Sequence, residues 1–583
     1  MQTMMTIGNK RRLVIIGITC LALAACGREE PAFQEKRYPI GLEADLEAYR
    51  TRIVETEDVQ EGLKTAWADG DRIRVMFGAG ALAELSTEDP ASGMFSGEVE
   101  TSAEAEAFRQ GHHYAATTSL QMRHSVVEGA LVSVVDLTGQ GGTASGVVPY
   151  ELMTADATAG STLRFSHRTS IMRLDITSSL LGESIMQMRL IFRPSAGSSA
   201  LFASEVTWRT GPAGLQQETE DATFFDLTLT EPLPLQNGVA RVYIVIPERH
   251  AVSGELSIEV TGAAGVSFRR YLNLSGKNFG AGSVVARQVK LTQAHAIPNL
   301  GDYYYSDGSW GPLDYYTDKY PIGVIISNYT DPGDRAEGYI HGYAMALRDA
   351  AWPTAWGPEN TDYAELPNVL EEVSSSAPLA MMENLDGLSK CRTIVQKYLT
   401  DNGWQAYNAG RTRATAAVPT AMEYGSDAWA YMYESTPGIH PFEAPASSSG
   451  WFLPGVGQWF LALTGLGGLD PEELSFDPRG GFRWTFDSAD EKQAYLDRFC
   501  NYFSSWSNPV LAQYEAEGAI VQSTFYLPYE GQMDWYLWSC DEATAGAAAA
   551  LYITANEIIF KATPKTAGED SDNGYASRPV IAF

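Results

Sequence analysis

The chain has 583 residues, of which 45% are hydrophobic, 11% aromatic and 19% charged, as in ordered globular proteins and unlike disordered tails or long coiled coils. This length predicts roughly three or four domains. Lys and Arg total 41 against 72 Asp and Glu, so the formal net charge is −31. Because such a field repels phosphate backbones, nucleic acid is excluded as an expected partner.

The N-terminus has the pattern of a secretion signal. Basic residues 10–12 precede an apolar run from Leu13 to Ala25. At about thirteen residues, this run is too short to cross a bilayer core of roughly 30 Å as a helix. It ends in Leu23-Ala24-Ala25-Cys26, which resembles the lipobox of bacterial lipoproteins. The resemblance implies a lipoprotein signal over residues 1–26, lipidation of Cys26 and a surface-exposed anchor in the outer membrane. The alternative is an ordinary signal peptide with a chance cysteine.

Three further cysteines follow the signal, namely Cys391, Cys500 and Cys540. In an oxidising compartment this odd number allows one disulfide and one unpaired thiol, and the pairing stays open. No Cys-x-x-Cys motif occurs, and no two of the eight histidines lie four residues apart. We therefore expect no metal site and no cofactor, and a zinc hydrolase is not expected.

Short apolar or alternating runs, bounded by Gly, Pro, Ser, Thr and Asn, predict β-strands from about residue 50 to residue 295. The clearest of these runs are 72–77, 131–135, 172–176, 188–192 and 242–247. Several short strands at such spacing predict β-sandwiches. Residues 141–160 are rich in Gly, Ala and Thr, so we place a boundary near residue 155, between lobes at 27–155 and 156–296.

Three segments of this region carry a family resemblance when taken together. The segments are 65–75 with Trp67 and Gly70-Asp71, 163–168 followed by 172–176, and 278–282 leading to 289–291. In this order they resemble the fimbrillins of Bacteroidales. The resemblance implies a mainly β N-terminal region made of two transthyretin-like β-sandwich lobes. Taken alone, Trp67, Phe165 and Phe279 are core residues that define a fold and not a binding site.

The fimbrillin resemblance also implies how the chain would assemble. In such pilus subunits a trypsin-like protease removes an early strand, and the next subunit donates a strand to the vacated groove. The partners would therefore be other fimbrial subunits. Arg50 and Arg52 are the candidate cleavage residues for protease maturation. The alternative is that they lie in a polar surface loop.

The composition changes near residue 296, where we expect a separate domain at 297–583. Eleven of the 13 tryptophans lie beyond this point. Runs at 320–326 and 342–347 predict two successive strands. Fimbrillin stalk subunits end near the close of the second lobe, whereas this chain continues. The resemblance therefore implies a tip or terminal subunit.

The C-terminal domain carries a second resemblance, in three segments. The segments are 450–459, 535–542 and 578–583. The first predicts a glycine and proline turn into a short helix. In this order they resemble the Trp-Leu-Pro, Tyr-Trp-Ser-Ser and Arg-Pro-Val signatures of the C-terminal domains of collagen-like bacterial adhesins. The resemblance implies an α+β fold of the C-type-lectin-like class. Leu537 and Cys540 depart from the pattern, and residues from about 465 to 525 read as an insertion.

Aromatic side chains can stack on sugar faces, although regularly spaced tryptophans are more often core residues. Ligand contacts are therefore better sought in segments rich in Gly, Pro and Asp. The candidates are Tyr303, Tyr305, Trp310, Trp352 and Trp356. Glycans or proteins of the host or of other bacteria are the expected ligands. Calcium-dependent sugar binding is not expected, because the chain has no Trp-Asn-Asp motif.

These patterns together predict a fimbrial tip subunit, exported as a surface lipoprotein, that mediates adhesion through its C-terminal domain. The alternative is a non-polymerising, glycan-binding lipoprotein of the cell surface, which would keep its first strand. No Gly-x-Ser-x-Gly elbow, phosphate loop or dinucleotide motif occurs, so we expect no enzyme activity. An enzyme with a reactive cysteine is the third hypothesis, and loss of turnover on changing one cysteine would distinguish it.

Overall fold

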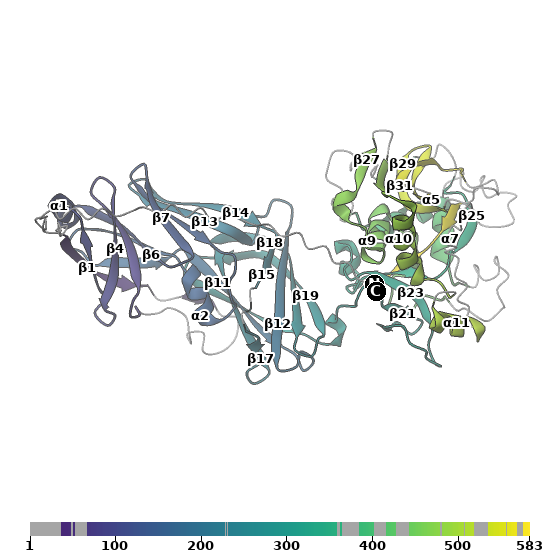
Figure 1. Cartoon of the computed structure of the whole chain (residues 1–583), viewed down its shortest axis with the longest axis horizontal. Coiled ribbons are helices and arrows are strands. Elements are labelled where there is room, and N and C mark those ends of the chain that lie inside the picture. The colour runs from purple at the N-terminus through teal and green to yellow at the C-terminus, as the bar shows by residue number, and fades with distance from the viewer. Residues whose placement is uncertain are drawn as a thin grey trace, which may run out of the picture.

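The computed structural model is mainly β and has several sheets, with most of its helices in the C-terminal part. Figure 1 shows an elongated β region that is joined to a rounder C-terminal part. No helix in the part of the chain that the structure describes is long and apolar enough to cross a membrane. The described residues are 37–47, 50–52, 67–227, 229, 231–357, 362–363, 366, 384–400, 416–426, 442–477, 481–505, 508–517, 535–554, 557–567 and 575–583.

The first sheet closes into a barrel, in the order β1-β10-β9-β6-β3-β4-β5. Its strands are β1 (Tyr38–Leu46), β3 (Arg72–Phe77), β4 (Ala81–Asp89), β5 (Met94–Val99), β6 (His112–Thr118), β9 (Met153–Thr158) and β10 (Leu163–His167). Because side chains alternate along a strand, Ile73, Val75 and Phe77 enter the barrel core while Met76 packs on the opposite face. The strand expected at 72–77 is confirmed as β3.

Helix α1 (Ser102–Gln110) covers this barrel and begins at a capping box. The Thr101 hydroxyl accepts from the Glu104 amide at 3.1 Å, and the Glu104 carboxylate accepts from the Thr101 amide at 3.0 Å. Ala105 and Phe108 form its buried face.

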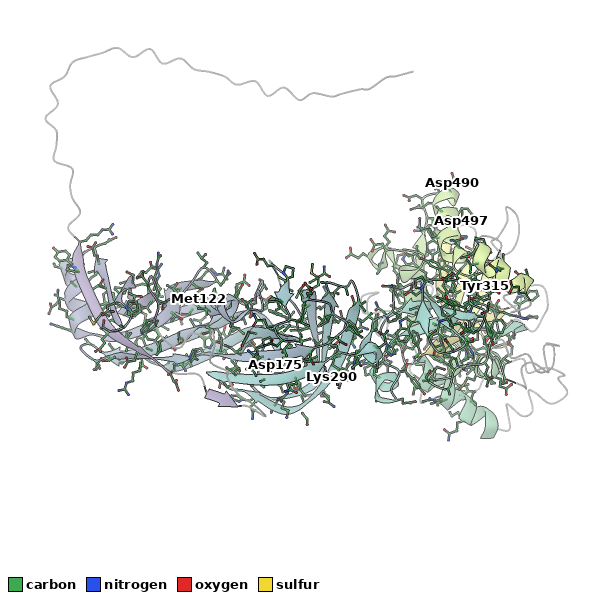
Figure 2. The ribbon with its side chains drawn as sticks, turned by 90° about the horizontal axis from the view of Figure 1, so that it is seen from below. Met122, Asp175, Lys290, Tyr315, Asp490 and Asp497 are labelled. Carbon is green, nitrogen blue, oxygen red and sulfur yellow. The ribbon has the colours of Figure 1, made fainter. Side chains whose placement is uncertain are left out.

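Three further sheets follow in the described part of the β region. The first has the order β17-β11-β20-β2, with β17 (Val239–Pro247), β11 (Thr169–Thr177), β20 (Ser283–Lys290) and β2 (Arg50–Arg52). The second comprises β15 (Phe224–Asp226), β12 (Ser184–Pro194), β18 (Arg249–Gly262), β19 (Ser267–Phe279) and β16 (Leu233–Pro234). Buried side chains of these two sheets pack into one core, as in a sandwich. In Figure 2, Asp175 on β11 and Lys290 on β20 lie close together on the first of these sheets.

The remaining sheet joins both sides of the boundary expected near residue 155. Strands β7 (Met122–Val127) and β8 (Ala130–Asp136) precede that boundary, yet β8 pairs with β13 (Phe202–Gly211), which in turn pairs with β14 (Gly214–Ala222). Strand β9 itself runs across residue 155, and the barrel continues to His167. The two expected lobes therefore share hydrogen bonds. The four other strands expected in this region are confirmed, as β8, β11, β12 and β17.

The described residues of the C-terminal part form two sheets. One has the order β22-β21-β23-β24-β33-β26, with β22 (Trp310–Gly311), β21 (Tyr303–Tyr305), β23 (Pro321–Ser327), β24 (Tyr343–Ala346), β33 (Val580–Ala582) and β26 (Trp451–Phe452). The other has the order β25-β32-β29-β30-β31-β28-β27, with β25 (Ala351–Thr354), β32 (Tyr575–Ser577), β29 (Trp535–Thr544), β30 (Ala547–Ile553), β31 (Glu557–Pro564), β28 (Gly481–Thr485) and β27 (Ser475–Asp477). Strands β23 and β24 confirm the two expected near 320–326 and 342–347.

Helices pack between and around these sheets. They are α3 (Pro332–Ala336), α5 (Gly387–Thr400), α7 (Ala417–Glu423), α9 (Val456–Gly465), α10 (Ala489–Asn501) and α11 (Pro509–Ala516). The glycine and proline turn expected before a short helix is confirmed at the start of α9, whose first eight residues are all buried. The segment expected as an insertion holds α10 and α11, and their buried residues Phe499 and Leu511 belong to the main core of this part.

One buried carboxylate joins three of these elements. Asp541 on β29 accepts from the Val456 amide at the start of α9, at 2.5 Å, and from Nζ of Lys390 on α5, at 2.6 Å. A helix N-terminus favours negative charge, so the α9 amide and the lysine stabilise the same group. Burial alone would lower the pKa of Lys390, but the Asp541 carboxylate contributes to holding this pKa above its usual value. The lysine is therefore charged inside the core.

Candidate functional site

The first candidate site is the barrel position occupied by β1. This strand lies between β5 and β10, antiparallel to the former and parallel to the latter. The register runs from Tyr38 opposite Val99 to Glu43 opposite Met94, and then from Ala44 opposite Leu163 to Leu46 opposite Phe165. We call the space between β5 and β10 the β1 slot. Figure 1 places it at the end of the molecule that is remote from the C-terminal part.

Apolar side chains hold β1 in its slot. Ile40 and Ala44 are buried in the barrel core, and Tyr38, Leu42 and Leu46 pack partly against it. The core side of the slot is aromatic, because Trp67 contacts Phe95 and Phe165 edge to face, with ring centroids 4.7 and 5.4 Å apart. A fully buried side chain of the size of Ile40 stabilises by about 1.5–3 kcal/mol. Without β1, this apolar surface would meet water.

Backbone contacts fix the register of β1. Nε1 of Trp67 donates to the Ala44 oxygen at 2.7 Å, and the Ala44 amide donates to the Gly93 oxygen at 2.9 Å. Gly93 has φ +66°, and a Cβ built there would lie 2.4 Å from the Ala44 oxygen. Glycine is therefore required at this position by both its conformation and the closeness of β1.

The chain leaves the slot directly after β1. The Glu47 amide donates to the Phe165 oxygen at 2.9 Å, and Nε2 of His167 lies 3.0 Å from the Glu47 oxygen. The candidate maturation residues Arg50 and Arg52 follow as the ends of β2, which pairs in parallel with Ser283–Val285 of β20 at the edge of the next sheet. They thus lie between two β units and within a paired strand. The candidate lipidation residue Cys26 lies outside the described residues.

Three of the five aromatic residues chosen as ligand contacts are in the core. Tyr303 and Tyr305 are 3% and 1% exposed, and Trp356 is fully buried. Their polar atoms are satisfied internally: Oη of Tyr303 donates to Tyr502 O at 2.7 Å, Oη of Tyr305 to Pro312 O at 2.8 Å, and Nε1 of Trp356 to Ser539 O at 2.8 Å. Burial also raises the pKa of Tyr305 to about 12. These three side chains therefore stabilise the core of the domain and are not accessible to a ligand at its surface.

The other two lie in different settings. Trp310 is half-buried, its ring centroid lies 4.5 Å from that of His341 and 5.5 Å from that of Phe583, and it also packs against the core of the preceding sandwich. Trp352, at the start of β25, is 57% exposed. Of the five candidates, it is therefore the one with a largely accessible ring.

Sequence reasoning missed the role of Trp310 because that role depends on a joint between the sandwich and the C-terminal part. Arg335 on α3 forms two bonds to the Glu255 carboxylate of β18, at 2.6 and 3.1 Å, and its guanidinium lies 4.7 Å from the Tyr271 ring centre. Arg269 of β19 bonds the Asn328 oxygen. We call this contact the joint.

His341 completes the joint. Its Nδ1 lies 3.0 Å from the Ala296 oxygen, and burial lowers its pKa. The ring is therefore neutral at pH 7, and the tautomer with hydrogen on Nδ1 donates to that oxygen.

A cluster of tyrosines near α11 offers a second accessible aromatic surface. Lys319 lies over the rings of Tyr305 and Tyr316, 4.5 and 4.4 Å from their centres, and Tyr315 packs on Tyr514 at 5.0 Å. Tyr315 and Tyr316 are half-buried, and Oη of Tyr315 donates to the Glu517 carboxylate at the surface. Figure 2 shows Tyr315 on the C-terminal part, at the opposite end from β1. Sequence reasoning did not select these two residues, although the adjacent pair Tyr315-Tyr316 is a signal that could have pointed to this surface.

The three C-terminal cysteines are all buried, and none is in a disulfide. Burial raises the pKa of Cys500 to about 12, so this thiol is unreactive at neutral pH. Among the described residues, no three His, Cys, Asp or Glu side chains are grouped so as to hold a metal ion.

The chain is structurally similar to fimbrial proteins of Bacteroides. One, from Bacteroides ovatus, has 12% identity, covers 93% of this chain and 99% of its own, and superposes with a TM-score of 0.28. A fimbrial protein of Bacteroides vulgatus has 11% identity over 44% of this chain and 96% of its own, with a TM-score of 0.22. A candidate cell adhesion protein of Bacteroides ovatus has 15% identity over 45% of this chain and 95% of its own, with a TM-score of 0.32.

No protein-family model matches the chain, and no curated protein matches it. At the identities above, similarity does not transfer a function, so function has to come from the residues of this chain.

Proposed function

We propose that this protein is a fimbrial tip subunit, exported as a surface lipoprotein through Cys26, that joins its neighbour by β-strand addition and adheres through its C-terminal domain. The proposal rests chiefly on one observation, the position of β1. This strand fills a slot that is hydrogen-bonded on both edges and apolar on its inner face, and two arginines follow it directly. It is a strand that cleavage after Arg50 or Arg52 would separate from the rest of the chain.

Loss of β1 would leave an empty slot that only a strand of a particular pattern can fill. The backbones of β5 and β10 would each have an unpaired edge, and the pockets of Ile40 and Ala44 would be exposed. Both defects are repaired by an incoming strand with apolar residues at alternate positions. At the position of Ala44 the backbone of the incoming strand would pass close to Gly93, as that of β1 does.

The assignment to a tip is supported by the C-terminal strand β33. It is an inner strand, paired with β24 on one side and β26 on the other. A strand held in this way is not free to enter the slot of another subunit. The domain at 297–583 is therefore proposed as the adhesive end, with a C-type-lectin-like fold, after two fimbrillin-like lobes.

Ligand contact is proposed at the accessible aromatic residues. Trp352 is exposed, and Tyr315 and Tyr316 are half-buried on the same domain. Exposed aromatic faces suit the apolar faces of sugars, and the ligand is proposed to be a glycan or a glycosylated protein.

The test is the N-terminus of the protein recovered from fibres sheared off cells. We expect sequencing to find a chain that begins after Arg50 or Arg52. The double variant Arg50→Ala, Arg52→Ala should keep β1 and be absent from the fibre fraction. Arg37→Ala, which removes a basic residue before β1, is the matched control and should be processed normally. Protein recovered from fibres that still begins at Cys26 would contradict the proposal.

The non-polymerising lipoprotein is the second candidate, and one observation favours it. Arg50–Arg52 are paired with β20, so a protease has to detach β2 before it can bind this segment as an extended chain. In that case Cys26 and β1 stay in the mature protein. Glycan binding by a chain that keeps its N-terminus and never enters fibres would identify this alternative.

A further inference from the structure

Two of the buried cysteines converge between α5 and β29. Cys391 lies one turn into α5 and Cys540 lies within β29, and both side chains are 0% exposed. Sγ of Cys391 lies 3.2 Å from the Leu453 oxygen, while the Cys540 amide donates to the next carbonyl, that of Pro454, at 2.9 Å. Sγ of Cys540 lies 3.7 Å from the oxygen of Gly387, the first residue of α5.

The two thiols are also close enough to influence each other. Burial raises the pKa of Cys540 most, and the side chain of Cys391 raises this pKa further, as expected for neighbouring sulfurs. Cys500, on α10, is a useful contrast, because it is buried among Tyr495, Phe499 and Phe503 of its own helical segment and the core. The three-cysteine set therefore divides into one adjacent pair and one separate thiol.

We propose that Cys391 and Cys540 form a disulfide when the chain folds outside the cytoplasm, and that Cys500 stays a thiol. The inference rests on the proposed function in one respect, namely export to an oxidising compartment. It adds a modification site that joins α5 to β29.

The reaction is thiol–disulfide exchange with an exported protein disulfide. One cysteine thiolate attacks a sulfur of the donor disulfide, which forms a mixed disulfide and releases one donor thiolate. The second cysteine then attacks its partner's sulfur and releases the other donor thiolate. Two S–H bonds are lost and one S–S bond forms in this chain. Two electrons pass to the donor, which leaves as a dithiol after taking up the two protons.

The exchange has to occur before the domain closes. In the folded domain both sulfurs are out of reach of a protein donor, and burial raises the pKa of Cys540, so its thiolate is scarce. A bond made during folding is protected from reductants for the same reason. It would close a loop containing α7, α9, α10 and α11, and long closed loops restrict the unfolded chain most.

The first experiment uses full-length protein on intact cells. Cells are quenched in acid, the protein is alkylated without reductant, and its peptides are analysed by mass spectrometry. We expect a peptide pair linked through Cys391 and Cys540, together with an alkylated Cys500. Alkylated Cys391 and Cys540 in surface-exposed protein would overturn the proposal.

Two additional arms separate this inference from the proposed function. Protease treatment of the same intact cells shows whether the chain is exposed on the cell surface. If the chain is protected from the protease, the proposed function is contradicted. In that case the refolding experiment alone tests the disulfide. Refolding of the reduced, purified protein in a glutathione redox buffer tests the pair directly. Formation of the Cys391–Cys540 link supports the geometry, and a Cys500 link or no link contradicts it.

Variants test the consequence for stability. Reductant, applied while the protein is unfolded, should lower the thermal midpoint of the C-terminal domain by roughly 5–10 °C in the natural protein and in Cys500→Ser. Cys391→Ser and Cys540→Ser should show no such response. If either serine variant does not fold, the double variant Cys391→Ala, Cys540→Ala replaces it. A reductant response that persists in that double variant would refute the assignment.

Discussion

The indole Nε1 of Trp67 donates a hydrogen bond to the backbone oxygen of Ala44 at 2.7 Å, and this bond ties β1 to the barrel core. Trp67→Phe keeps an aromatic ring but leaves the Ala44 oxygen unpaired, which costs about 1–3 kcal/mol. We expect β1 to detach about tenfold more often, and trypsin to cleave after Arg50 or Arg52 correspondingly faster. Mass spectrometry of a timed digest measures this rate. Trp208→Phe, in the remote strand β13, is the control, and equal acceleration in both variants would count against the assignment.

Gly93 should tolerate alanine much less than Gly129 does. Both have positive φ, +66° and +76°, so each alanine costs roughly 1–2 kcal/mol from the backbone alone. At Gly93 the new Cβ would also lie 2.4 Å from the Ala44 oxygen, whereas at Gly129 nothing lies within 4 Å. Urea unfolding of Gly93→Ala and Gly129→Ala separates the two effects. Equal urea midpoints would mean that the close approach of the Ala44 oxygen to Gly93 does not contribute to stability.

The joint should depend on Arg335. Its side chain is 3% exposed and bonds Glu255, so Arg335→Ala strands a partly buried carboxylate and should cost about 3 kcal/mol. We expect calorimetry to show the C-terminal domain unfolding separately from the sandwich, and small-angle scattering to show a broader range of particle lengths. Arg189→Ala breaks the exposed pair with Asp226 and should cost at most about 1 kcal/mol. A joint that is equally rigid in both variants would contradict this role.

The C-terminal domain should gain stability at neutral pH when Asp334 becomes Asn. Burial raises the pKa of Asp334 from 3.8 to about 6. The folded state therefore holds a proton that the unfolded state has lost, so the stability of the natural protein falls as pH rises from about 4 to about 6. Asp334→Asn should be more stable at pH 7.5, by up to about 3 kcal/mol. The gain should vanish near pH 4, which urea midpoints at both values test. A gain that is independent of pH would exclude this cause.

Ligand binding should depend on Trp352 and not directly on Trp356. Trp352→Ala removes a ring that is 57% exposed, so the thermal midpoint should stay within about 2 °C of the natural value while glycan-array binding falls at least tenfold. Trp356→Ala leaves a large cavity in the core and should cost about 3–5 kcal/mol. Unchanged binding by a folded Trp352→Ala protein would move the proposed contact to Tyr315 and Tyr316.

Local patterns in the sequence predicted strands well. The run at 72–77 predicted β3, and the glycine and proline turn before Val456 predicted the start of α9. These features depend on neighbours in the chain. The shared sheet of β8 and β13 was not predicted, because it pairs Val134 with Thr207 and no local signal carries such a pairing.

The candidate ligand residues show the same limit. Tyr303 and Tyr305 were chosen because Gly and Asp surround them, but β21 pairs with β22 and β23 and becomes an inner strand with buried side chains. Trp310 was chosen for similar reasons and instead meets His341 and the sandwich core. Trp352 is exposed because its strand β25 lies at a sheet edge. Strand order, rather than residue type, decided which aromatic rings reach the surface.

The carboxylate of Asp541 sets how the C-terminal domain can come apart. Its two oxygens are divided between the first amide of α9 and the lysine of α5, while its backbone belongs to β29. If α5, α9 or β29 moved away alone, at least one of these contacts of the buried carboxylate would be broken, which costs about 3–5 kcal/mol. The three elements are therefore coupled, and a force that acts on one of them is shared with the other two.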